Sequence, residues 1–501
     1  MMKRSLLGAA VAAMTVVPTA AIAADSAEMT EVRRLIEQMK NEYEQKIDAL
    51  EQRLEAAEQK AETTGDKAKQ PGTASQTAQG RSAQGAVTSA SAFNPQISVI
   101  LDGNYYHDDV DGEGTELLGE ADGISHAHGA DHGHEEDGHS HSGAEQGFNF
   151  RSAELAFSAS VDSYFDATAL LAIESGGDVE LEEAWLQTRS LPNGFKVKVG
   201  KFLSDIGYMN NQHPHYWDFT DQNLAYLNLL GDHGLRDTGV QVTWLPDWDH
   251  YTLFGVEVLQ GEQEKLGALA EIDEHMEEEL DEAGFSVDDL GLDDEEDGPR
   301  LYTAFLKYAP DLGYDHALQL GIWGGWADQH QEIHGDAEDG DLHSLQGDAM
   351  VWGIDAVYKY SAGGAYGHGD IKLQGEYLSS RKDLDVEFHQ ANPAAIGAER
   401  KFTEDGLYIQ GLYGFAPRWK VGLRYDVVGL TNKLESGGSE LRDWDDSNRW
   451  TAALTWTPTE FSQMRLQYAK ADITIDDESE DVGYLYLQYL VSMGSHGAHK
   501  F

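Results

Sequence analysis

The stretch FKVKVGKF, residues 195–202, alternates between two kinds of side chain. Successive side chains of an extended strand point to opposite sides, so the lysines share one face and the apolar residues the other. The stretch ISVILDGNY, residues 97–105, has the same alternation. A row of lysines facing lipid would be costly, so we expect Lys196, Lys198 and Lys201 to face an aqueous interior or lie near its ends. Both stretches predict strands with one apolar and one polar face.

Segments of this kind recur from Gln96 onward, and each has about the length that a tilted strand needs to cross a bilayer. We count sixteen, at 96–107, 148–160, 165–175, 178–190, 195–205, 236–246, 250–260, 300–309, 316–328, 348–360, 369–380, 404–415, 419–430, 447–457, 461–471 and 482–493. The fold class predicted is all-β, a transmembrane antiparallel β-barrel of about 16 strands over residues 96–501, with an N-terminal α-helical coiled coil.

The connections between these segments support the same fold. Most alternate between short turns that contain proline, such as 191–194 and 416–418, and long loops. The long connections are 108–147, 206–235, 261–299, 329–347, 381–403 and 431–446. Bacterial barrels have an even number of strands, short periplasmic turns and long extracellular loops. A soluble β-sandwich, the alternative, would not need this asymmetry.

The two ends of the chain predict export to the outer membrane. Residues 1–23 read as a signal peptide, with Lys3 and Arg4 before an apolar run and a cleavage site at Ala21-Ile22-Ala23. No later run of about 18 apolar residues follows, so insertion in a membrane would require strands. The aromatic Phe501 is typical of the last strand of an outer-membrane barrel, although HGAHKF, residues 496–501, departs from simple alternation.

Two further segments precede the barrel. Residues 24–61 carry apolar side chains in steps of three and four, which predicts a periplasmic coiled coil. A lone solvated helix or a disordered acidic arm is the alternative. Residues 62–95 lose this periodicity and are rich in Thr, Gly, Ala, Ser and Gln, which is typical of a flexible linker.

The composition excludes several classes of function. The 501 residues include 35 basic and 89 acidic side chains and no cysteine, for a net charge of −54. This charge argues against nucleic acid as a partner and favours cations near the protein. Disulfides and thiolate metal sites are excluded. No nucleophile elbow, phosphate loop or His-Glu-x-x-His motif is present, so we do not expect an enzyme.

The first long loop carries six histidines with acidic residues between them. Imidazole is a ligand for zinc, copper and nickel, and carboxylates can complete the shell. We predict a metal-capture loop, or alternatively a solvated low-complexity loop. The predicted ligands are His126, His128, His132, His134, His139, His141, Asp131 and Glu135.

Two other long loops are predicted to act on cations. Loop 206–235 is unusually apolar, so we expect it to fold into the barrel as a constriction, or alternatively to pack at a subunit interface. Its predicted lining residues are His213, His215, Asp218, Asp221 and His233. Loop 261–299 is acidic and predicts a cation-attracting rim, or alternatively a solvated loop bridged to lipopolysaccharide by divalent ions. The rim residues are Glu277, Glu278, Glu279, Asp293, Asp294, Glu295 and Glu296.

The order of segments resembles that of the phosphate-selective porins O and P, which are sixteen-stranded trimers lined by a ladder of lysine and arginine. The excess of acidic residues departs from that ladder. The chain also resembles proteins described as zinc-regulated TonB-dependent outer-membrane receptors, through GKFLSDIGY at 200–208, QHPHYWDF at 212–219, the histidine loop and the HGAHKF end. This second resemblance implies a role in zinc acquisition. Residues 25–95 are far too few for the plug domain that TonB-dependent receptors carry.

We therefore expect a homotrimeric porin of the Gram-negative cell outer membrane, in contact with lipopolysaccharide and, through its coiled coil, with peptidoglycan. No cofactor is required, and Zn²⁺ is the expected transported or loop-bound ion. One alternative is a general or anion porin of the phosphate type, in which the histidine loop is incidental. Another is a metal-binding structural protein of the envelope.

Overall fold

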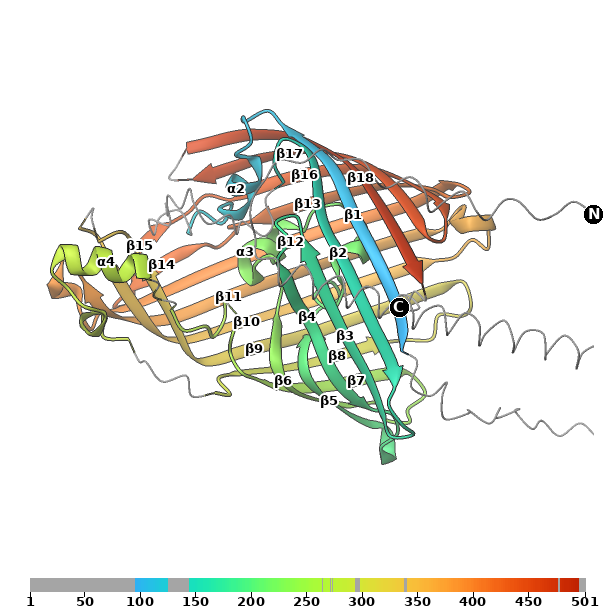
Figure 1. Cartoon of the computed structure of the whole chain (residues 1–501), viewed down its shortest axis with the longest axis horizontal. Coiled ribbons are helices and arrows are strands. Elements are labelled where there is room, and N and C mark those ends of the chain that lie inside the picture. Colours follow the sequence, from blue (N-terminus) through green and yellow to red (C-terminus); the bar gives the residue numbers. More distant parts are fainter. Residues whose placement is uncertain are drawn as a thin grey trace, which may run out of the picture. The chain divides into compact units, whose positions relative to one another are not determined.

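The computed structural model describes residues 95–124, 144–263, 265–270, 272, 274–292, 298–337, 340–475 and 478–494. The predicted signal peptide, coiled coil, linker and C-terminal tail lie outside these residues, apart from Pro95. No helix among the described residues is both long enough and apolar enough to cross a membrane. The described residues form one large antiparallel sheet that closes on itself (Figure 1).

Sixteen strands make up the wall of this barrel in the described part of the chain, as predicted. They are β1 (Gln96–Asp108), β2 (Gly147–Ser160), β3 (Phe165–Glu174), β4 (Val179–Thr188), β5 (Phe195–Leu203), β6 (Arg236–Trp244), β7 (Tyr251–Leu259), β8 (Leu301–Ala309), β9 (His316–His334), β10 (His343–Tyr360), β11 (Ile371–His389), β12 (Glu399–Ala416), β13 (Trp419–Val428), β16 (Ser447–Thr459), β17 (Ser462–Ile475) and β18 (Glu478–Gly494).

Each wall strand pairs with its neighbour along the chain, and pairing of β18 with β1 closes the ring. The short strands β14 (Lys433–Ser436) and β15 (Ser439–Asp443) form a hairpin outside the wall, because β13 pairs directly with β16. β14 pairs with Lys401–Thr403, near the start of β12. The closed ring leaves no unpaired edge in its wall, which is the condition for a sheet to lie in lipid.

The wall has the reverse polarity of a soluble protein. On β13, Leu423 is 58% exposed and its neighbour Arg424 only 1%. On β12, Ile409 is 56% exposed and Gln410 only 4%. The apolar side chains therefore face outward and the polar ones face the interior, at the period of two that a strand imposes. This pattern is the one that transmembrane barrels show.

The connections differ between the two ends of the barrel. At one end they are short, including 161–164, 245–250, 417–418 and 460–461, and at the other lie the long connections 109–146, 204–235 and 260–300. Strands β9 to β12 extend further toward the long-loop end than the sequence indicated. Beyond the membrane a strand no longer needs an apolar face, so alternation in hydrophobicity does not mark its end.

Several short helices belong to the connections. They are α2 (Gly114–Gly119), α3 (Leu224–Leu230), α4 (Glu274–Ala283), η2 (Pro192–Gly194), η3 (Pro214–Tyr216), η4 (Val287–Leu290), η5 (Ala365–Gly367) and η6 (Pro393–Ala395). Helix α3 and its connection pack against inward side chains of the wall, and Ile206, Trp217 and Tyr226 join Trp323 and Tyr408 in one buried cluster. This apolar connection between β5 and β6 thus occupies the barrel interior.

Candidate metal centre on the luminal loop

The connection 204–235, called the luminal loop from here on, is held to the wall at its start by Glu376 of β11. The backbone N–H groups of Tyr208 and Met209 donate to the Glu376 carboxylate at 3.0 and 2.9 Å. The Tyr226 hydroxyl, from α3, donates to the same carboxylate at 2.9 Å. Gly207 has φ +56°, and a Cβ at this position would collide with the Tyr226 hydroxyl. The loop therefore enters the interior along a path that only glycine readily follows.

Asp221 binds a later part of the luminal loop to side chains of the barrel wall. Its carboxylate accepts from Arg424 at 2.7 Å and from Arg449 at 3.1 Å. Tyr484 and Gln467 each donate to it at 2.7 Å. Burial alone would raise the pKa of Asp221, but the two guanidinium groups outweigh it and hold the pKa well below its usual range. This carboxylate is therefore ionised and fully engaged.

Asp218 is tied to a different part of the wall. Its carboxylate lies 2.7 Å from the ammonium of Lys372 on β11 and accepts from Gln410 on β12 at 3.1 Å. Burial opposes ionisation, and Lys372 overcomes that effect, so the pKa of Asp218 is lowered. Both predicted acidic lining residues thus lie inside the barrel, where they bind wall cations and are not available as metal ligands.

Two of the three histidines of the loop, His213 and His215, are presented together by η3. Pro214 begins this single turn and separates His213 from His215, and the two imidazole planes are parallel within 4° with ring centroids 5.9 Å apart. The fixed φ of proline favours such a turn and limits the freedom of its neighbours. A short rigid segment therefore carries two potential ligands to the wall.

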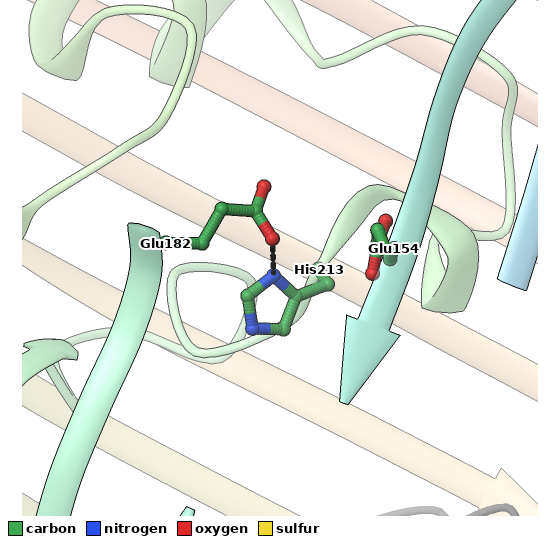
Figure 2. Close-up of side chains that lie close together, drawn as sticks. All are labelled: Glu154, Glu182 and His213. Carbon is green, nitrogen blue, oxygen red and sulfur yellow. Dashed lines mark ion pairs between the residues drawn. The ribbon is translucent and has the colours of Figure 1, made fainter. Parts of the chain in front are cut away.

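Carboxylates of β2 and β4 meet these histidines. Nδ1 of His215 lies 2.8 Å from Oε2 of Glu154, and Nε2 of His213 lies 2.9 Å from Oε1 of Glu183. Nδ1 of His213 is 3.6 Å from Oε2 of Glu182. These five residues are called the luminal cluster below. In Figure 2 the His213 ring lies between Glu182 and Glu154.

Three members of the luminal cluster already have the spacing of a metal site. One ligand atom from each of Glu154, Glu182 and His213 lies within 4.8 Å of the others, the only such group in the part of the chain that the structure describes. Oε2 of Glu182 is buried and accepts no hydrogen bond from a described residue, with the His213 ring 3.6 Å away. A buried, unsatisfied carboxylate oxygen is costly unless a cation or a donor satisfies it. Imidazole and carboxylate together suit zinc and other borderline divalent ions.

The charge state of His213 determines how such an ion would bind. Burial lowers the pKa of His213, but the hydrogen bond with Glu183 and the charges of Glu183, Glu182 and Glu154 raise it to about 9. The ring is therefore protonated at neutral pH. A metal ion has to displace that proton, at a cost of about 1.4 kcal/mol for each pH unit below the pKa.

The remaining predicted site residues fall elsewhere. His233 is exposed and does not belong to the three-ligand group. Glu277, Glu278 and Glu279 lie on α4, while Asp293, Asp294, Glu295 and Glu296 lie outside the described residues. The whole predicted capture loop, 126–141, also lies outside them.

Sequence reasoning did not single out Glu154, Glu182 and Glu183, although all three lie in predicted strands. The available signal was the alternation of β4, which carries Glu180 and Glu182 on one face. A carboxylate in the middle of a membrane strand is costly on the lipid side, so its presence indicates an inward position.

Comparison with known proteins identifies a relative by sequence. No family model matches the chain. An uncharacterized protein of Aquifex aeolicus (strain VF5) is 35% identical over 418 residues, which cover 82% of this chain and 81% of that protein. The chain belongs to the family of this Aquifex protein. The family is thus represented by a protein whose description gives no activity.

Solved structures with a similar arrangement are outer-membrane proteins. They include OmpT of Vibrio cholerae (12% identity, 97% of that chain, TM-score 0.44), the channel DcaP of Acinetobacter baumannii (12%, 96%, 0.44) and OprB of Pseudomonas putida (10%, 94%, 0.44). Each covers 80% of this chain. Likeness at this level of identity and TM-score carries no argument about function, so the wall polarity and the luminal cluster must supply it.

Proposed function

We propose that the protein is an outer-membrane porin that passes small solutes, preferentially divalent cations such as zinc. The observation that carries the proposal is the luminal cluster, in which Glu154, Glu182 and His213 converge inside a barrel with an apolar exterior. An ion drawn to the long-loop end would meet these ligands where the luminal loop approaches β2 and β4. The cluster binds through few ligands and competes with a proton, so an ion can leave as well as enter.

Other parts of the proposal rest on the sequence. The histidines between His126 and His141 would gather the ion outside, and the acidic α4 would raise its local concentration. The signal peptide and the reversed polarity of the wall support an outer-membrane location. The homotrimer, the contacts with lipopolysaccharide and peptidoglycan, and the link to zinc acquisition are proposed on the architecture and the resemblance stated above.

The test is conductance in planar bilayers with purified full-length protein. Under a KCl gradient we expect a reversal potential that indicates preference for cations. Added Zn²⁺ should occupy the luminal cluster and reduce the K⁺ current, and E182Q should raise the half-blocking Zn²⁺ concentration at least about tenfold. E435Q, on the β14–β15 hairpin, should leave it unchanged. A clear anion preference, or equal block of both variants, would reject the proposal.

One observation favours a second function, passage of small anions. A cavity of about 850 Å³ opens near the short-turn end and is lined by Lys196, Lys198 and Lys307 among others. These ammonium groups would attract anions to that end of the interior. The same reversal potential distinguishes the two functions, because a lysine-dominated pore gives the opposite sign.

A further inference from the structure

Three histidines stand side by side where β9, β10 and β11 approach the long-loop end. His343, the first residue of β10, pairs with His334 of β9 on one side and with His389 of β11 on the other. Directly opposed residues of neighbouring strands project from the same face of the sheet. We call His334, His343 and His389 the rim row. No sequence motif marks it, because the three residues come from three separate strands.

The two separations between neighbouring rings of the rim row suit a shared ion. The ring centroids of His334 and His343 are 5.3 Å apart, and those of His343 and His389 are 5.0 Å apart. Two imidazoles that bind one zinc ion at about 2.0–2.1 Å with a tetrahedral angle have centroids roughly 5 Å apart. Both neighbouring pairs of rings are therefore already at the centroid spacing that a shared ion requires.

Neighbouring groups orient two of these rings. Nε2 of His334 lies 2.9 Å from the carboxylate of Glu332, and Nδ1 of His343 lies 3.1 Å from the backbone carbonyl of Asp341. An acceptor at one ring nitrogen keeps the proton there and leaves the lone pair on the other nitrogen, as in carboxylate–histidine–zinc arrangements. Nδ1 of His389 is buried and makes no hydrogen bond to a described residue.

We propose that the rim row is a second metal site, which binds a borderline divalent cation such as Zn²⁺, Cu²⁺ or Ni²⁺ through three imidazoles. Three neutral nitrogen ligands and an open fourth position suit these ions and not Mg²⁺ or Ca²⁺, which prefer oxygen. Among the described residues only the luminal cluster has three ligand atoms within 4.8 Å of one another. The ring nitrogens of the rim row are not all this close together, so the imidazoles must rotate about their side-chain torsions to bind one ion.

The surroundings of the rim row favour a cation. Helix α4 belongs to an apolar cluster with Ala337, Leu342 and Phe388, which adjoin the rim row along the chain. Figure 1 shows α4 at the same end of β9, β10 and β11. Its exposed Glu277 and Glu278 add negative charge near this end of the barrel. The inference is independent of the proposed porin function, because the site would bind metal whether or not solute crosses the barrel.

Calorimetric titration of full-length protein with Zn²⁺ alone tests the inference. The six histidines from His126 to His141 are first replaced by asparagine to remove their contribution, and E182Q is added to weaken the luminal cluster. H343N and H389N are then compared in this background. The matched control is H316N, at the opposite end of β9, where the imidazole also packs against β10 through Tyr358.

In that background we expect one class of Zn²⁺ site, which H343N and H389N each weaken at least about tenfold and H316N leaves unchanged. Mg²⁺ should give no heat of binding at the same concentrations. If H343N and H389N bind Zn²⁺ as the background protein does, the rim row is not a metal site. Conductance of the same variants reports separately on the porin function, so failure of one proposal does not imply failure of the other.

Discussion

Neutralising Asp221 should release the luminal loop from the wall. Its carboxylate is the common partner of Arg424 and Arg449, and it also accepts from Tyr484 and Gln467. The substitution D221N keeps the shape of the side chain and removes the charge. In the asparagine side chain, an NH₂ group replaces one of the two carboxylate oxygens. A donor then faces a guanidinium group where an acceptor stood before.

The size of the effect depends on the ion pairs that Arg424 and Arg449 keep after the substitution. Breaking a buried ion pair costs about 3–5 kcal/mol. Asp426 still binds both guanidinium groups, at 3.0 Å to Arg424 and 2.9 Å to Arg449, so the lower end of that range applies. A cost of about 3 kcal/mol raises the ratio of released to docked loop by about 150-fold, since each 1.4 kcal/mol is a factor of ten.

Cleavage by chymotrypsin at neutral pH measures this ratio. The luminal loop contains Tyr208, Tyr216, Trp217, Phe219 and Tyr226 as cleavage sites. The cleavage rate follows the population of the released loop when opening and closing are fast. D218N is the matched control, because Asp218 binds one lysine and one amide and should give a smaller increase. Equal cleavage of D221N and the unaltered protein, or faster cleavage of D218N than of D221N, would refute the reasoning.

Three further outcomes are expected. Asp218 and Asp221 have pKa values below the ordinary value of about 3.9, so their anchors stabilise the docked loop above that pH and lose strength as the pH falls below it. The hydrogen-exchange protection factors of residues 206–230, taken relative to the intrinsic exchange rate at each pH, should therefore fall below about pH 4, and protection that is constant down to pH 2 would contradict this. G207A should destabilise the docked loop by more than about 1 kcal/mol, because φ is +56° and the new Cβ meets the Tyr226 hydroxyl; chymotrypsin cleavage no faster than in the unaltered protein would count against it. L423K should lower the free energy of unfolding in lipid vesicles by about 2–4 kcal/mol, and a loss no larger than that of L423A would argue that this face does not meet lipid.

The wall of the barrel was predictable from sequence for a physical reason. A strand between lipid and an aqueous interior must alternate in polarity over its whole crossing, and this requirement is local. The sixteen segments therefore stand out one by one. The long-loop ends of β9 and β10 could not be recognised in this way. Residues such as His330 and Gln346 continue the sheet beyond the lipid, where a strand does not need an apolar face.

The luminal loop could be predicted only in part from local sequence patterns. Its apolar composition predicted an interior position, and His213 and His215 were recognised by residue type. The partners of Asp221 could not be recognised, because Arg424 and Arg449 lie more than 200 residues away and meet it only through closure of the ring. Glu154 could not be recognised as a partner of His215 either, because it lies on β2 and meets the loop only in the folded barrel.

The position of charge in the barrel, more than the net charge of −54, should decide which ions pass. Mobile ions screen an exposed charge beyond about 8 Å at physiological ionic strength, so acidic loops act on ions at the mouth and little on ions deep inside. Within the barrel, Asp218 and Asp221 are neutralised by wall cations. The carboxylates of the luminal cluster outnumber its two histidines, whereas lysines line the cavity near the short-turn end. Selectivity should therefore depend on which of these two regions is narrower, and E182Q should shift the reversal potential toward anions only if the luminal cluster limits the current.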